Sequence, residues 1–321
     1  MVPPRHANPM RSLIVIDLEW NTATRKPQAD PELAAKMPFE IIEIGAVKLD
    51  GQLRVTDTFH RRVRPVLYKQ IQYHIAQVTR RTQQSLGDGK AFEAVARELF
   101  DFAGREALFA SWGTSDPEVL ISNLIFHAID PLPSFTALNI QAVFSNLAEG
   151  TSRGNQRSIE YALDFLRLDK DLPFHEALSD ALYAARILEA TVKPELDEKP
   201  GPAPASLLRA YVYNPFLVSQ SEERVELGKA DDPLDYLRNR FYACPACGRP
   251  VAGDWLVINP GKSWFAAGIC PQHGDIELTA KRARRTRVPA IMVRVRIPQG
   301  PLVTPRPVTE KEPLVWTDPE A

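Results

Sequence analysis

The feature that most constrains the fold is an apolar run ending in two carboxylates, Leu13-Ile-Val-Ile-Asp-Leu-Glu19. Its β-branched residues predict a buried strand at about 12–17. Residues two apart in a strand share a face, so Asp17 and Glu19 are expected on one side of its tip. Two like charges held this close need a cation to neutralise them, and divalent ions prefer carboxylate oxygens. The run therefore predicts a metal site at a sheet edge.

Asp-x-Glu is common by chance. It indicates a site here because further acidic residues and a histidine follow it in a particular order along the chain. Asp116 closes Ser111-Trp-Gly-Thr-Ser-Asp116 and is expected at the N-cap of a helix over 117–129. His175 precedes Asp180 by five residues, near the start of a helix expected over 176–192. Four carboxylates converging at strand ends suit two divalent ions that activate a water and stabilise a phosphodiester under in-line attack. A neutral imidazole suits a general base for that water.

The remaining pattern up to residue 192 predicts a sheet flanked by helices. Strands at 40–50 and 53–64 would be joined by a tight Asp50-Gly51 turn and would form an antiparallel meander with the first strand. Further strands are expected at 107–112 and 134–137, and further helices at 91–104, 140–147 and 158–167.

The ordered motifs resemble the DEDDh 3′–5′ exonucleases of the RNase H-like fold. That family carries Asp-x-Glu in its first strand, a Glu-Ile-Ile-Glu-Ile-Gly-Ala-type second strand, a mid-chain Asp and a late His-x-x-x-x-Asp. The matches here are Asp17 and Glu19, the run 40–47, Asp116, and His175 with Asp180. The resemblance covers about residues 12–192. It implies an α/β fold with a mixed five-stranded sheet and removal of nucleotides from 3′ ends of single-stranded RNA or DNA. It also implies two Mg²⁺ or Mn²⁺ ions on the four acids, with His175 as the base.

Candidate substrate contacts follow from the same resemblance. Ser111-Trp-Gly113 resembles the branch containing RNA 3′-end-trimming enzymes and some bacterial sporulation-associated relatives, which favours RNA slightly over DNA. The segment 74–79 resembles the stretch that packs against the terminal nucleotide. The candidates are Leu18, Trp20, His74, Thr79 and Trp112. The two tryptophans could equally be core residues, His74 and Thr79 could be structural, and His60 and His127 are expected to be incidental.

The C-terminal third contains all three cysteines, in two matched Cys-x-x-Cys and Cys-x-x-His knuckles. An odd number of cysteines at this spacing argues for metal rather than disulfides. The four ligands Cys244, Cys247, Cys270 and His273 suit one structural tetrahedral zinc, with unbound thiols beside a chance histidine as the alternative. Hairpin strands expected at 255–259 and 264–268 predict a zinc ribbon, which at this size would need its metal to fold.

A basic run follows the ribbon, although the whole chain carries a net charge of −1. It contains Lys281, Arg282, Arg284, Arg285 and Arg287. Beside a zinc ribbon on a nuclease, this run favours a phosphate-tracking surface. The alternative is an ordinary solvated face.

The length of 321 residues predicts two domains. The expected parts are a lead over 1–10, an exonuclease domain over 11–192, a proline-rich linker over 193–205, a zinc-ribbon domain over 206–297 and a proline-rich tail over 298–321. No apolar stretch suits a membrane span, which favours a cytoplasmic protein without membrane partners. The ribbon is expected to bind nucleic acid or a partner protein. The alternative function is a non-catalytic adaptor that retains the exonuclease fold, and the intact set of five site residues argues against it.

Overall fold

The structure is a computed structural model that describes residues 12–22, 32, 34, 37–79, 81–104, 107–151, 157–198, 204–228, 231–283, 288–298 and 301–302. The chain divides into two compact units, Met1–Phe216 and Leu217–Ala321. The expected lead over 1–10 and most of the expected tail over 298–321 lie outside the described residues. Within the described part of the chain, no helix is long and apolar enough to cross a membrane.

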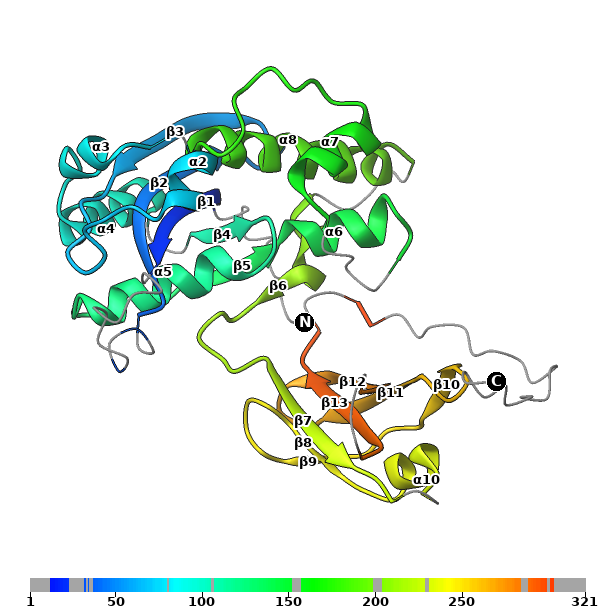
Figure 1. Cartoon of the computed structure of the whole chain (residues 1–321). Coiled ribbons are helices and arrows are strands. Elements are labelled where there is room, and N and C mark those ends of the chain that lie inside the picture. Colours follow the sequence, from blue (N-terminus) through cyan, green and yellow to red (C-terminus); the bar gives the residue numbers. More distant parts are fainter. Residues whose placement is uncertain are drawn as a thin grey trace, which may run out of the picture. The chain divides into compact units, whose positions relative to one another are not determined.

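The first unit is built on a six-stranded sheet in the order β3-β2-β1-β4-β5-β6 (Figure 1). The strands are β1 (Leu13–Thr22), β2 (Phe39–Leu49), β3 (Val55–Arg62), β4 (Leu108–Ser111), β5 (Thr136–Asn139) and β6 (Val212–Tyr213). The sheet is mixed, because β1 pairs antiparallel with β2 and parallel with β4. The predicted fold class is therefore confirmed. The sixth strand went unpredicted because two residues are too few to show a strand period.

Helices cover both faces of this sheet (Figure 1). They are α2 (Tyr73–Thr79), α3 (Gln83–Gly87), α4 (Phe92–Ala103), α5 (Ser115–Phe126), α6 (Ile140–Leu147), α7 (Ile159–Leu166), α8 (Ala177–Glu198) and α9 (Pro204–Leu208). Ile14 and Ile16 of β1 share one apolar cluster with residues of α4 and α5. Leu13 and Val15 share the opposite cluster with residues of α6 and α8. A strand buried on both faces reads as a continuous apolar run, as β1 does.

The turn between β2 and β3 differs from the expected Asp50-Gly51 hairpin. Leu53, rather than Gly51, adopts the left-handed region, with φ of 62°. The Asp50 carbonyl accepts a hydrogen bond from the Leu53 amide at 3.0 Å, and its carboxylate accepts from the Gln52 amide at 2.8 Å. Burial of the Leu53 side chain, which is 2% exposed, holds this unfavourable backbone conformation.

The expected linker over 193–205 is corrected at both ends. Helix α8 continues through Pro194 to Glu198, and α9 begins at Pro204, where a proline suits the first helical turn. The chain then returns to the first unit, because β6 pairs with β5 and the Phe216 ring lies 5.1 Å from the Phe135 ring. The first unit therefore extends to Phe216 rather than 192, and residues 206–216 belong to it.

The second unit contains a five-stranded antiparallel sheet in the order β10-β11-β12-β13-β7 and a separate two-stranded hairpin, β8–β9. The elements are β7 (Gln220–Glu226), α10 (Pro233–Arg238), β8 (Tyr242–Ala243), β9 (Pro250–Val251), β10 (Leu256–Asn259), β11 (Ser263–Cys270), β12 (Gly274–Arg282) and β13 (Ala290–Arg296). Side chains such as Leu237, Trp264 and Val293 form a buried apolar core. This unit is larger than the expected ribbon, because β7 and β13 widen the sheet.

Candidate active site and metal centre

The first unit brings the four predicted acids together from three elements. Asp17 and Glu19 lie in β1, Asp116 lies in the first turn of α5 and Asp180 lies in the first turn of α8. Asp116 Oδ1 accepts a hydrogen bond from the Leu18 amide at 2.9 Å. This bond ties α5 to β1 between the two β1 acids, as expected for a shared site.

Asp116 holds a different helical position from the one predicted. Thr114 is the N-cap of α5, and Asp116 is the second helical residue. Its carboxylate accepts a hydrogen bond from the Leu18 amide of β1, and its own backbone amide also stabilises its charge. The first turn of a helix still favours a carboxylate, because the amides there carry partial positive charge.

The electrostatics of the cluster show too little positive charge for its acids. Burial, together with the charges of Asp116 and Asp180, raises the pKa of Asp17 well above its usual value. Burial and the charge of Asp180 raise the pKa of Glu19 to about 8. Burial also raises the pKa of Asp116 to about 7, although the hydrogen bond from Leu18 opposes the rise. A divalent cation would supply the missing positive charge.

His175 lies beside two of the acids on an exposed segment before α8. Glu19, His175 and Asp180 each offer one ligand atom, and these atoms lie within 4.8 Å of one another. The His175 amide donates to Asp180 Oδ2 at 3.0 Å, and its φ of 63° is rare for a residue other than glycine. The other oxygen, Asp180 Oδ1, is buried without a hydrogen-bond partner among the described residues. Such an orphaned oxygen is costly unless a cation binds it, so the donor set fits a divalent ion.

Gly45 of β2 allows α8 to approach the sheet, a role that the sequence analysis missed. It pairs with Asp17 in the β1–β2 ladder. A Cβ atom at this position would lie 2.2 Å from the carbonyl carbon of Ala177, the first residue of α8. A glycine inside an otherwise apolar strand is the signal that could have indicated this close backbone approach.

A second charged group lies next to the acids and was also missed. Glu43 pairs with Glu19 across the β1–β2 ladder. Its Oε1 lies 2.7 Å from His60 Nε2 and 2.6 Å from Arg81 Nη2. Burial opposes ionisation, but hydrogen bonds from His60 and Arg81 prevail and lower the pKa of Glu43. A glutamate in the middle of an apolar run was the available signal, and His60, expected to be incidental, belongs to this group.

The predicted substrate contacts have varied surroundings. Leu18 is buried, and the Trp20 ring packs 5.6 Å from the Phe39 ring. Trp112 Nε1 donates to the Arg157 carbonyl at 2.7 Å.

On α2, the buried Thr79 hydroxyl donates to the Ile75 carbonyl at 2.8 Å, whereas His74 is exposed. Thr79 and the two tryptophans thus make contacts within the protein, and their role at the substrate stays a prediction. His127, expected to be incidental, lies 2.9 Å from a Glu93 oxygen and stacks on Phe92.

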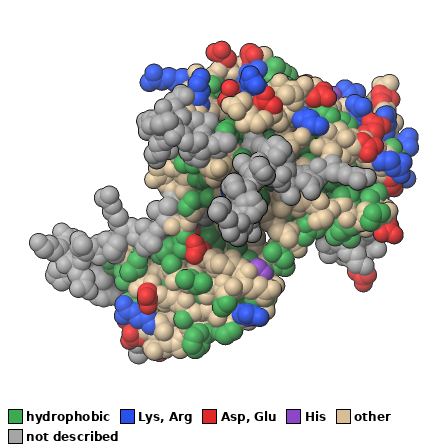
Figure 2. Space-filling model, turned by 180° about the vertical axis from the view of Figure 1, so that it is seen from behind, with side chains coloured by type: hydrophobic (Ala, Val, Ile, Leu, Met, Phe, Trp, Pro, Cys, Tyr) green, Lys and Arg blue, Asp and Glu red, His purple; other side chains and the backbone are tan. Residues whose placement is uncertain are grey.

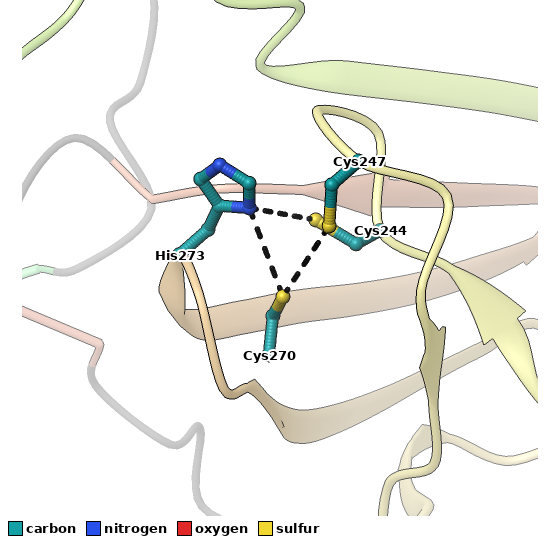
Figure 3. Close-up of side chains that lie close together, drawn as sticks. All are labelled: Cys244, Cys247, Cys270 and His273. Carbon is teal, nitrogen blue, oxygen red and sulfur yellow. Dashed lines mark hydrogen bonds between the residues drawn. The ribbon is translucent and has the colours of Figure 1, made fainter.

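The second unit brings the four predicted zinc ligands together (Figure 3). Cys244 Sγ lies 3.6 Å from His273 Nδ1, and Cys270 Sγ lies 3.7 Å from both Cys247 Sγ and His273 Nδ1. Zinc–ligand bonds of about 2.0–2.3 Å in a tetrahedron would separate the ligand atoms by about 3.6–3.8 Å. Burial opposes ionisation of Cys270, but hydrogen bonds from the Gln272 amide and from His273 lower its pKa to about 6. Burial raises the pKa of Cys244, so it is the spacing of the four ligand atoms and the thiolate tendency of Cys270 that suit zinc.

The basic run is described only at its start. Lys281 and Arg282 are exposed at the end of β12, while Arg284, Arg285 and Arg287 lie outside the described residues. Figure 2 shows acidic and basic side chains interspersed over the visible face, rather than gathered into one basic stripe. Because the net charge of the chain is −1, attraction to phosphates must come from local groups such as this run.

The chain is similar to known exonucleases in family and in fold. A family model described as an exonuclease, RNase_T, matches residues 14–188. The structure of E. coli exonuclease I in complex with a dA16 oligonucleotide has a TM-score of 0.54 at 13% identity, covering 90% of this chain and 64% of that chain. Another exonuclease I structure has a TM-score of 0.52 at 13% identity, covering 91% and 64% of the two chains. A full-length 3′-exonuclease has a TM-score of 0.49 at 22% identity, covering 59% and 84%. No curated protein matches the chain.

Proposed function

This chain belongs to the RNase_T exonuclease family, and from that membership we propose that it is a DEDDh-type 3′–5′ exonuclease acting on single-stranded nucleic acid. The observation that carries the proposal is the mutual repulsion of Asp17, Glu19, Asp116 and Asp180, among which Asp180 has a buried oxygen without a hydrogen-bond partner in the described part of the chain. Acids that only solvated the surface would not be buried together with raised pKa values.

The four acids are the residues that would hold two Mg²⁺ or Mn²⁺ ions. Bound there, the ions would polarise the phosphoryl oxygens and make a water more acidic. The protein fixes these acids through its backbone. The Leu18 amide holds Asp116, and the His175 amide holds Asp180.

In this proposal His175 takes the proton from the attacking water. The water oxygen forms a bond to phosphorus as the bond from phosphorus to the 3′ oxygen of the preceding nucleotide breaks, and that oxygen is then protonated. The released product is a nucleoside 5′-monophosphate. The exposed position of His175 next to Glu19 and Asp180 supports this role, since a general base must reach its proton within hydrogen-bond distance.

RNA as the slightly favoured substrate rests on the Ser111-Trp-Gly113 resemblance to RNA 3′-end-trimming enzymes. The two tryptophans, Leu18, His74 and Thr79 remain candidates for the surroundings of the terminal nucleotide. For the second unit, the proposal is one structural zinc ion on the Cys₃His group and a surface that binds nucleic acid or a partner protein. Its basic run would follow the phosphate backbone.

The test offers matched single-stranded RNA and DNA, each labelled at the 3′ end or the 5′ end, with and without Mn²⁺. The proposal expects immediate release of labelled mononucleotide from 3′-labelled strands and progressively shortened 5′-labelled strands, in both cases only with metal. The matched control, Asp180→Asn, should lose several orders of magnitude in rate while remaining folded. Folded wild-type protein that binds strands but never shortens them would support the adaptor function instead.

A further inference from the structure

A fifth carboxylate lies beside the acidic cluster, and the proposed reaction does not use it. Glu43 in β2 lies directly opposite Glu19 in β1, and its side chain is 1% exposed. Side chains at directly opposite positions of an antiparallel pair share a face, with Cβ atoms about 5 Å apart. The four site acids are short of positive charge, whereas His60 and Arg81 both contact Glu43.

Arg81 is held close to the site but incompletely satisfied. Its side chain is 14% exposed and contacts both carboxylate oxygens of Glu43, and its amide lies 3.4 Å from the Thr79 hydroxyl oxygen. Its Nε is buried, with no hydrogen-bond partner in the described part of the chain. Its charge also reaches Glu19, since Arg81 lowers the pKa of Glu19 while burial and Glu43 raise it. A buried guanidinium with an unused donor will pair with a second carboxylate if its first partner is lost.

We propose that Glu43 is a positioning residue that sequesters Arg81, so that the guanidinium does not neutralise Glu19. The Glu19 carboxylate then stays available to a divalent cation. This inference rests on the proposed role of Glu19 as a metal ligand. Its physical basis is competition for the Glu19 carboxylate between a buried arginine and a cation. Glu43 binds the Arg81 guanidinium directly, next to Glu19 in the β1–β2 ladder, and so keeps it from pairing with Glu19.

The test measures Mn²⁺ binding directly, by the loss of the free-ion electron paramagnetic resonance signal, on the full chain. Glu43→Gln should weaken Mn²⁺ binding by roughly tenfold or more, because it removes the anion that holds the Arg81 charge at the position paired with Glu19. The double variant Glu43→Gln/Arg81→Met should bind Mn²⁺ to within about threefold of wild type, since the competing cation is gone. Arg81→Met alone should bind at least as tightly as wild type.

The matched control is Glu98→Gln. Glu98 in α4 also pairs with an arginine, Arg61 in β3, at 2.6 Å, but it is not among the groups that shift the pKa values of Asp17 and Glu19. The control should leave Mn²⁺ binding unchanged. The inference is overturned if Glu43→Gln binds Mn²⁺ as tightly as wild type. It is also overturned if the double variant binds Mn²⁺ as weakly as Glu43→Gln alone. If Glu43→Gln does not fold, Arg81→Met decides, and weaker binding by that variant overturns the inference.

The proposed function fails by a different outcome. It fails if wild-type protein binds no Mn²⁺ at this site, or if Asp180→Asn binds it as well as wild type. A third outcome would overturn only the role of Glu43. In it, wild-type protein binds Mn²⁺, Asp180→Asn does not, and Glu43→Gln binds as tightly as wild type.

Discussion

At the scale of single residues, the proposed function assigns metal binding to the acids and proton transfer to His175. His175 contributes its amide to Asp180, while its imidazole lies on an exposed segment near Glu19. In His175→Ala the amide remains, so the Asp180 carboxylate should keep its place. We therefore expect turnover to fall by roughly a hundredfold or more, because loss of a general base typically has that effect. Mn²⁺ affinity should stay within a few-fold of wild type.

The measurement pairs single-turnover rates with Mn²⁺ titrations of the same preparations, using Asp180→Asn as the contrasting variant. Asp180→Asn should lose both rate and binding, because it removes the charge of a ligand. If His175→Ala also loses Mn²⁺ binding, His175 is a ligand and another group must be the base.

At the scale of elements, the position of α8 depends on one missing side chain. A methyl group at Gly45 would overlap the backbone at Ala177 and Leu178, where neither element can give way without moving the other. Gly45→Ala should lower the free energy of unfolding by about 1–3 kcal/mol, as overpacking typically does. It should also reduce activity, since α8 carries Asp180. Gly51→Ala is the matched control, because nothing lies within 4 Å of a Cβ there. Equal denaturation midpoints for the two variants would contradict this account of Gly45.

The four proposed zinc ligands join the β8–β9 hairpin to the five-stranded sheet of the second unit. Cys244 and Cys247 lie in the turn that joins β8 to β9, whereas Cys270 and His273 lie at the β11–β12 turn. Trp264 and Val293 belong to the same buried cluster as Cys244 and Cys270, but in the strand register they lie toward the opposite end of the β11–β12–β13 ladder from the Cys270–Gly274 pair. We expect one tightly bound zinc per chain, lost in Cys247→Ser, with faster amide exchange confined to β8, β9 and the β11–β12 turn. Global exchange of the second unit would mean that the metal holds the whole sheet.

The sequence predicted those elements whose pattern is local. Strands β1 and β2 and helices α6 and α7 have apolar residues at the right period, and the acids could be grouped because strand ends meet at a sheet edge. Strand β6 could not be predicted, because two residues have no period and its pairing with β5 is long-range. The roles of Gly45 and Arg81 depend on what packs against them, which no local pattern contains.

At the scale of the whole molecule, the crowded acids link stability to pH and metal. Glu19 and Asp116 have pKa values of about 8 and about 7 in the folded protein, against about 4 in an unfolded chain. The folded state therefore binds more protons between these values, and its free energy of unfolding falls as pH rises from about 4 to about 8. Without added divalent ions the melting temperature should fall over this range, and Mg²⁺ should raise it more at pH 8 than at pH 5. Glu19→Gln should flatten both trends. If the melting temperature of Glu19→Gln depends on pH as steeply as that of wild type, groups other than Glu19 are responsible for the pH dependence.

Because the first unit extends to Phe216, we predict that it folds and cleaves by itself, whereas the second unit contributes to the binding of long strands. Residues 204–216 complete its sheet and core through β6, Tyr211 and Phe216. A chain ending after Phe216 should therefore fold and cleave very short oligonucleotides at the full-length rate, whereas a chain ending after Val192 should be unstable. Long single strands should bind more weakly to the shorter active form, because the basic run beginning at Lys281 is gone.

The salt dependence of single-strand binding tests whether the second unit contacts the phosphate backbone or instead binds a partner protein. Loss of backbone contacts should flatten the slope of log affinity against log salt by roughly 0.7 per lost phosphate contact on single strands. Substituting Arg282, Arg284, Arg285 and Arg287 in the full chain should give much of the same flattening. Turnover at saturating substrate should hardly change, because uniform binding does not stabilise the transition state. If both forms have the wild-type slope, the basic run is a solvated or protein-docking face, and strand recognition resides in the first unit.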